Sequence, residues 1–279
     1  MTIKIEPMDK QPQNLFPEAV RIGAMEIFGK QSIHPFLLKL LPAGTVDEVP
    51  LSDSCLSKML HDNEAIALGG YRFAKRQSEY LTGRICAKLA IQDFLSSTKT
   101  YPSPLNLAKI EIVNTPNGRP TIRIHSSITG RPTMDISIAH SGDYGVALAS
   151  QAQCGIDIQR QETTLLRVQK KYCSEDEYRL LETFSTDKTE SNMTTRLNIL
   201  WAAKEAAKKA LSYWEMPGFL NLKLRELRNF TNNIALSLNI THTTNNQMPK
   251  EVTVAANIFD EYALAICLAK EVNKDAGIT

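Results

Sequence analysis

The fold is decided by two similar segments, DYGVALAS at residues 143–150 and DEYALAICLA at residues 260–269. Each begins with one or two acidic residues and a tyrosine, and continues as a short apolar run typical of a buried strand. Each also follows, at a distance, a long stretch with helical periodicity. Short apolar strands often resemble one another, so coincidence is the alternative. We interpret the echo as two similar α/β halves, residues 1–150 and residues 151–279.

Helical and strand patterns alternate along the rest of the chain. Apolar residues recur at helical spacing in residues 73–96 and again in residues 194–213, which predicts two long helices. The sequence SEDE at residues 174–177 has the pattern of a capping box and predicts the start of a further helix. Strands are predicted at residues 110–113, 121–125, 135–139, 144–149 and 155–158, and within residues 222–240 and 250–269. Residues 1–20 are expected to be an extended lead-in.

Composition excludes several classes of protein. The chain has 279 residues, 43% of them hydrophobic and 22% charged, which is ordinary for a globular protein of about two domains. A net charge of +2 argues against a dedicated nucleic-acid binder. No apolar run is long enough to span a membrane, and the first 30 residues lack the pattern of a signal peptide. Five scattered cysteines without a CxxC pair fit reduced thiols, so we expect a cytoplasmic protein without membrane or nucleic-acid partners.

Two stretches of the second half combine charges with apolar support. In GIDIQ, residues 155–159, Asp157 and Gln159 share one strand face, where they could hold a hard cation. The alternative is an aspartate that caps a turn. In WAAKEAAKK, residues 201–209, Glu205 and Lys209 lie on one stripe of a helix together with Trp201. Here the alternative is an ion pair on a solvated helix face.

Basic residues and a histidine mark the first half. Residues 72–88 contain five basic residues and one glutamate, and Arg76 and Arg84 lie on one helical stripe. Arginine suits phosphate oxygens, although a basic solvent-facing stripe is the alternative. The segment SIAHSG at residues 137–142 leads a predicted strand through His140 into a small-residue turn. Such a histidine can approach a phosphate closely, or can simply be exposed.

Taken together and in order, these motifs resemble the Sfp-type 4'-phosphopantetheinyl transferases. The family pattern S-H-S-G, G-[IV]-D-x-E and W-x-x-K-E-A-x-x-K is similar to AHSG, GIDIQ and WAAKEAAKK. KRQSEYLTGR at residues 75–84 resembles a helix of the subgroup typified by enterobactin synthase component D, and NGRP at residues 117–120 resembles a family turn. Two positions depart from the pattern: Ala139 replaces a hydroxyl residue, and Gln159 replaces a glutamate. The resemblance begins near residue 72 and leaves residues 1–60 outside it.

The resemblance implies a fold, a reaction and partners. The implied fold is α/β (α+β), a pseudo-two-fold pair of similar halves, each with a small antiparallel sheet and a long helix. The implied enzyme is a monomeric transferase that moves 4'-phosphopantetheine from coenzyme A to a serine of an apo acyl or peptidyl carrier protein. It releases 3',5'-ADP and depends on Mg²⁺. The subgroup favours a carrier domain of nonribosomal peptide, polyketide or siderophore biosynthesis.

The resemblance also implies roles for individual residues. The metal is expected at Asp157, Glu205 and Gln159, and Gln159 brings no charge to it. The expected catalytic residues are Glu205 as the base, with Lys209 and Asp157. Contacts with coenzyme A are expected from Arg76, Arg84, Arg119, His140, Lys204 and Lys209. Because Gln159 and Ala139 depart from the pattern, the alternative is a degenerate, non-catalytic module that binds coenzyme A or a carrier protein.

Overall fold

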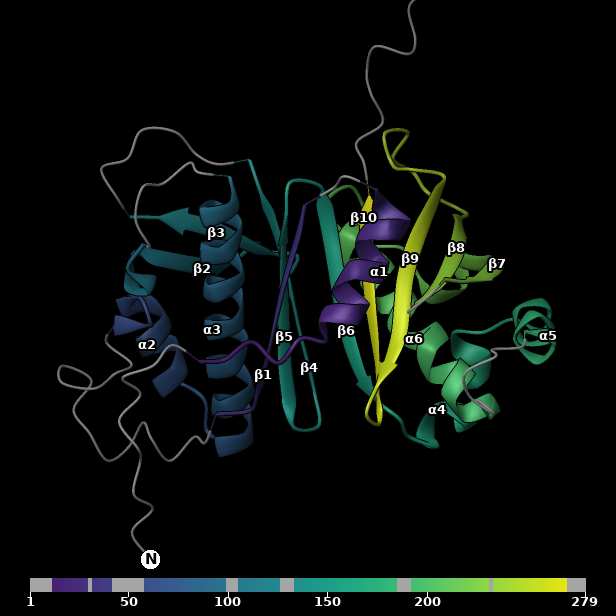
Figure 1. Cartoon of the computed structure of the whole chain (residues 1–279), viewed down its shortest axis with the longest axis horizontal. Coiled ribbons are helices and arrows are strands. Elements are labelled where there is room, and N and C mark those ends of the chain that lie inside the picture. The colour runs from purple at the N-terminus through teal and green to yellow at the C-terminus, as the bar shows by residue number, and fades with distance from the viewer. Residues whose placement is uncertain are drawn as a thin grey trace, which may run out of the picture.

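The structure, a computed structural model, describes residues 12–29, 32–41, 58–98, 105–125, 133–184, 192–230 and 233–269. It is a mixed α/β protein with small antiparallel sheets and long helices (Figure 1). Its elements are α1 (Glu18–Phe28), β1 (Ile33–Lys39), α2 (Asp62–Gly69), α3 (Ala74–Ser97), η3 (Leu107–Lys109), β2 (Ile110–Asn114), β3 (Pro120–Ile124), β4 (Asp135–Ser141), β5 (Tyr144–Ser150), β6 (Gln153–Arg160), α4 (Thr164–Arg167), η4 (Gln169–Lys171), α5 (Glu175–Thr183), α6 (Met193–Leu211), η5 (Phe219–Asn221), β7 (Leu222–Asn229), β8 (Ile234–Ile240), β9 (Glu251–Phe259) and β10 (Tyr262–Ala269).

The strands form three antiparallel sheets in the part of the chain that the structure describes. One has the order β1-β5-β4, a second has the order β6-β10-β9-β8-β7, and β2 and β3 form a hairpin. Figure 1 shows the two larger sheets side by side, with α3 against the first and α6 against the second. Both long helices and the strands predicted from periodicity are confirmed. The sequence pattern did not predict α1, β1, α2 or α4, and α1 begins inside the predicted lead-in.

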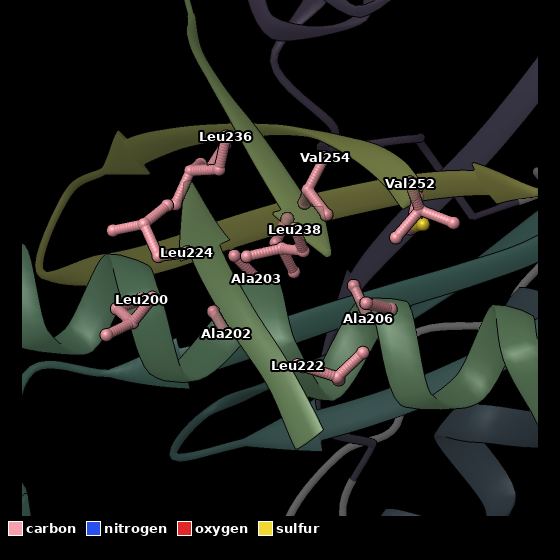
Figure 2. Packing of buried hydrophobic residues seen from close by; sticks show 14 of the residues in the cluster. Leu200, Ala202, Ala203, Ala206, Leu222, Leu224, Leu236, Leu238, Val252 and Val254 are labelled. Atoms are coloured by element: carbon pink, nitrogen blue, oxygen red, sulfur yellow. The ribbon is translucent and has the colours of Figure 1, made fainter. Parts of the chain in front are cut away.

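Close packing of α6 on β6 requires small residues on both sides. The helix presents Ala202, Ala203 and Ala206 to the sheet, and Figure 2 shows these alanines among leucines and valines of β7, β8 and β9. On the strand side, Gly155 lies directly under the helix. A Cβ atom at Gly155 would lie 1.8 Å from the carbonyl oxygen of Ala206. Because that obstacle is backbone, only glycine permits this approach.

A buried ion pair fixes α3 in the first half. The ammonium of Lys88 lies 2.5 Å from Glu64 Oε2 and is fully buried. It also donates hydrogen bonds to the carbonyl oxygens of Met59 (2.8 Å) and Leu107 (3.0 Å). The other carboxylate oxygen of Glu64 accepts the backbone N–H of Ile112, at 2.9 Å. One lysine and one glutamate thus tie the long helix to α2, to η3 and to the first strand of the hairpin.

The second half repeats this arrangement group by group. Lys204 Nζ lies 2.6 Å from Glu177 Oε1 and donates to the carbonyl oxygens of Tyr172 (2.6 Å) and Phe219 (3.3 Å). The same carboxylate accepts the backbone N–H of Leu224, at 2.7 Å.

The glutamates of these two pairs occupy the same place in the local structure. Glu64 and Glu177 are each the third residue of a helix that starts with a capping box, whose N-caps are His61 and Ser174. The capping box predicted at Ser174 is therefore confirmed. The repeat relates α2, α3 and η3 to α5, α6 and η5, and β5 to β10, so the predicted pair of similar α/β halves is confirmed. The division at residue 150 stays a prediction.

The first helix crosses from one half to the other. Although α1 precedes β1 in the chain, it packs on β9 of the second sheet (Figure 1). Val20 and Ala24 of α1 belong to an apolar cluster that also contains Ile156 of β6 and Ala255 of β9. Asn233 donates a hydrogen bond from its side chain to the carbonyl oxygen of Val20, at 2.9 Å. The two halves therefore share part of their hydrophobic core.

We expect Gly155→Ala to lower the free energy of unfolding by about 3 kcal/mol or more. Overpacking of a filled core typically costs about 1–3 kcal/mol, and here the obstacle is helix backbone, which no side-chain rotation relieves. Urea denaturation of the full chain measures the change. The matched control is Gly69→Ala at the end of α2, where an added Cβ would have no neighbour within 4 Å. Equal stability of the two variants would contradict the packing described here.

Candidate functional site

The candidate site lies where the two halves meet. Strand β4 is an edge of the first sheet and β6 is an edge of the second. Three side chains of β4 accept backbone N–H groups of β6: Asp135 from Cys154 (2.7 Å), Ser137 from Ile156 (3.0 Å) and Ser141 from Arg160 (3.0 Å). In each pair, the residue of β6 follows its partner of β4 by 19 residues. Because this offset is constant along both strands, the strands run parallel. We call this row of hydrogen bonds the seam.

The seam has a gap at Ala139. This residue is buried and has the same strand parity as Ser137 and Ser141, but its methyl group cannot accept a hydrogen bond. The backbone N–H of Ile158, next in the row on β6, instead lowers the pKa of the neighbouring Asp157 carboxyl. The departure at Ala139 thus lies in the joint between the halves.

Asp157 is held by a lysine of α6. Lys209 Nζ lies 2.7 Å from Asp157 Oδ1 and donates a second hydrogen bond to the carbonyl oxygen of Ile156, at 3.0 Å. Burial raises the pKa of Asp157 to about 6, against the lowering effect of Lys209, and the charge of Glu205 raises the pKa further. The structure therefore places Lys209 in contact with Asp157 and places Glu205 near enough to affect the pKa of Asp157. The resemblance implies that these three residues lie together.

Glu205 lies one turn before Lys209 and is partly exposed. Its Oε1 atom is 3.4 Å from the ammonium of Lys208, which also lies 3.9 Å from the ring centroid of Phe219. Lys208 matches no position of the motif, and such a lysine on a helix is expected to be solvated. The structure contradicts that expectation, because only 16% of its side chain is exposed.

Gln159 lies two residues beyond Asp157 on β6. Its amide nitrogen donates a hydrogen bond to the carbonyl oxygen of Arg160, at 2.9 Å. The side chain is half-buried. Its predicted role as a metal ligand stays a prediction.

Across the seam, the first half contributes a buried carboxylate surrounded by cationic groups. Glu79 of α3 receives Arg76 Nη1 at 2.9 Å, and His140 Nδ1 lies 3.6 Å from its other oxygen. Lys75 Nζ is 4.0 Å away. Burial lowers the pKa of His140, as do the charges of Arg76 and Lys209, while Glu79 opposes them. Charged groups from both halves therefore affect the pKa of this imidazole.

Arg76 and Arg84 differ in how accessible they are. The side chain of Arg76 is 62% exposed, so a ligand can reach it although its Nη1 group pairs with Glu79. Arg84 is mostly covered, and its guanidinium carbon lies 4.6 Å from the ring centroid of Tyr80. The Nε–H of Arg84 is buried and has no hydrogen-bond partner within the described ranges. The predicted contacts of both arginines with coenzyme A stay predictions.

Arg119 is bound within the protein, and its predicted contact with coenzyme A stays a prediction. Its guanidinium donates to the carbonyl oxygen of Lys209 (2.5 Å), to Ser212 Oγ (2.7 Å) and to Gln153 Oε1 (2.8 Å), and pairs with Asp135. Only 9% of the side chain is exposed. Arg119 therefore joins the hairpin of the first half to the end of α6, and both of its Nη groups have partners within the protein.

Lys204 is likewise bound within the protein, and its predicted contact with coenzyme A stays a prediction. Its side chain is 0% exposed and its ammonium is used by Glu177 and two carbonyl oxygens. Burial lowers the pKa of Lys204, and the adjacent Glu177 opposes that effect. A lysine next to Glu205 in sequence therefore points into the core of the second half and away from any ligand at the seam.

Two parts of the site are not predicted by the sequence pattern. They are Glu79, which stands out only as the one acidic residue of the basic stretch 72–88, and the seam acceptors. The seam did leave a signal in the sequence. DISIAHS alternates with period two, and its polar residues at positions 135, 137 and 141 are the seam acceptors.

Comparisons with known proteins bear on the second half above all. Residues 153–267 match the model of the 4'-phosphopantetheinyl transferase superfamily. Apo-ACPS from Chronobacterium ammoniagenes is 23% identical, with a TM-score of 0.35, over 43% of this chain and 94% of that chain. Its complex with CoA is 22% identical, with a TM-score of 0.35, over 43% and 95%. Holo-ACP-synthase from Plasmodium yoelii is 19% identical, with a TM-score of 0.32, over 42% and 91%.

Two negative findings complete the comparison. No curated protein matches the chain. Within the described ranges, every helix is too short or too polar to cross a membrane.

We expect Lys204→Met to destabilise the protein by about 3–5 kcal/mol, because it leaves the carboxylate of Glu177 buried without its partner. Urea denaturation measures the loss, and the double variant Lys204→Met/Glu177→Gln should recover part of it. Lys223→Met, at an exposed position of β7, is the control. If Lys204→Met is instead stable and raises the KM for coenzyme A, Lys204 has the coenzyme A contact expected from the sequence.

Proposed function

We propose that the chain transfers 4'-phosphopantetheine from coenzyme A to a serine hydroxyl of an apo acyl or peptidyl carrier protein and releases 3',5'-ADP. The observation that carries the proposal is the meeting of Asp157, Glu205 and Lys209 opposite His140 and Glu79 at the seam. The superfamily match over residues 153–267 includes the first three of these residues. The proposal assigns coenzyme A phosphate contacts to residues 1–150 and the metal site to residues 151–279.

The acidic pair suits Mg²⁺. Mg²⁺ prefers oxygen ligands and is often held by one or two carboxylates together with substrate phosphates. Asp157 and Glu205 are close enough that the charge of Glu205 raises the pKa of Asp157, and a cation relieves such repulsion. Gln159 would add an uncharged amide oxygen. When bound there, the cation neutralises charge on the diphosphate.

The chain's own groups supply the base and the anion contacts. Glu205 accepts the proton of the serine hydroxyl, which is a weak nucleophile at neutral pH. The serine oxygen forms the new bond to phosphorus, the diphosphate bridge breaks, and 3',5'-ADP leaves with the bridging oxygen. Lys209 stabilises the charge that develops on that oxygen. His140 and the exposed Arg76 bind phosphate oxygens from the opposite side.

We propose that the acceptor is a carrier domain of nonribosomal peptide, polyketide or siderophore biosynthesis. This choice rests on the resemblance of residues 75–84 alone. The second candidate function is a non-catalytic module that binds coenzyme A or a carrier protein. Gln159 favours it, because its amide replaces a charged ligand and is bonded to the backbone of Arg160. Retention of Asp157, Glu205 and Lys209 favours the enzyme.

We expect Asp157→Asn and Glu205→Gln each to lower the transfer rate by about 100-fold or more, because each removes a charge that the reaction requires. Mass spectrometry of apo carrier proteins incubated with coenzyme A and Mg²⁺ measures the transfer, and EDTA should abolish it. Glu182→Gln, on the exposed face of α5, is the control. Full activity of both variants, with no effect of EDTA, would refute the site. Tight binding of coenzyme A by a wild-type chain without transfer would favour the second candidate.

We expect Arg76→Ala to raise the KM for coenzyme A by about tenfold, the loss of one charge-assisted hydrogen bond. The KM for 3'-dephospho-coenzyme A should change much less if Arg76 contacts the 3'-phosphate. Steady-state kinetics with both substrates distinguishes the cases, and Arg123→Ala on an exposed position of β3 is the control. Equal losses with both substrates would place Arg76 at the diphosphate, and no loss with either would remove it from the site.

A further inference from the structure

Two histidines and a glutamate gather at the outer end of the first half. They are His61, the N-cap of α2, Glu111 of β2, and His125, which directly follows β3. One potential ligand atom from each lies within 4.8 Å of the other two. Within the described ranges, this is the one group of three or more such residues that meets this distance. None of the three belongs to the seam or to the site proposed above.

The carboxylate of Glu111 faces both imidazoles. His125 Nε2 lies 2.9 Å from Glu111 Oε2, and His61 Nδ1 lies 3.9 Å from Glu111 Oε1. The two imidazole rings stack with their centroids 4.4 Å apart. Glu111 is buried, and Asn63 fixes its orientation by donating a hydrogen bond to Oε1, at 2.8 Å. His125 is 44% exposed, so the cluster is open to solvent on one side.

This donor set suits a transition metal ion. Imidazole nitrogens favour Zn²⁺ and its neighbours, whereas Mg²⁺ and Ca²⁺ prefer oxygen ligands. With metal–ligand distances of about 2.0–2.2 Å, tetrahedral ligands lie about 3.3 Å apart, so modest rotation of the exposed His125 suffices. Solvent water would fill the fourth position. The hydrogen bond of Glu111 from Asn63 is the kind of outer contact that orients a metal-bound carboxylate.

Metal binding would compete with part of the helix cap. His61 Nδ1 accepts the backbone N–H of Asn63, at a long 3.3 Å. The other half of the capping box is the hydrogen bond from the His61 backbone to Glu64 Oε2, at 2.9 Å, which does not involve the imidazole. The histidine can therefore exchange its weaker hydrogen bond for a metal without loss of the whole cap.

The cluster occurs in the half whose hairpin lacks support from a larger sheet. In the second half, β7 and β8 are part of the five-stranded sheet, whereas their equivalents β2 and β3 form a separate pair in the described chain. A lone two-stranded hairpin is marginally stable. The positions equivalent to His61, Glu111 and His125 are occupied by Ser174, Lys223 and Thr241, which do not form such a set.

We propose that His61, Glu111 and His125 bind a divalent transition metal ion of the Zn²⁺ type, which fastens the β2–β3 hairpin to the start of α2. This ion differs from the Mg²⁺ of the proposed reaction, because it would have other ligands and lie at another place in the fold. The proposal does not depend on the transfer activity.

Calorimetric titration of Zn²⁺ into the full chain tests the proposal. The titration uses protein without a histidine tag, and it includes excess Mg²⁺ so that sites made of oxygen ligands are already occupied. The variants are His61→Asn, which retains a good capping residue, and His125→Gln. His242→Gln, at an exposed position outside the cluster, is the control. Circular dichroism confirms that each variant is folded.

We expect wild type and His242→Gln to bind one Zn²⁺, and both cluster variants to bind it at least tenfold more weakly. The same ion should raise the thermal midpoint of wild type and of the control, and not that of the cluster variants. Co²⁺ in place of Zn²⁺ should give visible absorption bands that both cluster variants lose. Absence of one-to-one binding in wild type, or binding that both cluster variants retain unchanged, would overturn the proposal.

Discussion

The row of side-chain hydrogen bonds between β4 and β6 sets the relative position of everything else in the molecule. Each sheet ends in an edge strand, and an exposed edge would pair with any other strand. Here the acceptors are the side chains of Asp135, Ser137 and Ser141, so the edges meet without merging into one continuous sheet. The long helices remain on separate sheets, and the ends of β4 and α3 come to face Asp157 and Lys209. The proposed site is a consequence of how the halves are joined.

The two buried lysines explain why the halves resemble each other more in structure than in sequence. Lys88 and Lys204 make the same contacts with a carboxylate and two carbonyl oxygens, although the residues around them differ. A buried ion pair contributes little net stability, but the loss of one partner is strongly unfavourable. The pair therefore restricts which substitutions the chain tolerates, and it specifies how each helix meets its hairpin.

Local periodicity allowed the long helices and most strands to be predicted, because these elements bury one face along their whole length. Long-range partners left no such pattern. Arg119 lies 90 residues before Lys209, whose carbonyl oxygen it binds, and its turn motif alone suggested a phosphate contact. Lys204 precedes Glu205 by one residue, but the turn of the helix directs it into the core. Strand β1 contains Pro35, and proline is uncommon inside strands, so the pattern there does not indicate one. Helical spacing placed Glu205 and Lys209 on one stripe, and the family resemblance implied that Asp157 lies beside them, whereas the position of Glu79 depends on tertiary structure.

The path of α1 limits how the molecule can move. Enzymes with two lobes often admit a substrate by a hinge motion. In this chain, residues that precede the first strand are packed on the far sheet, and Val20 is bonded to Asn233 near the other end of the sequence. Separation of the lobes would expose the apolar cluster shared by α1, β6 and β9. A hinge motion between the halves would therefore have to break an apolar cluster that both of them share.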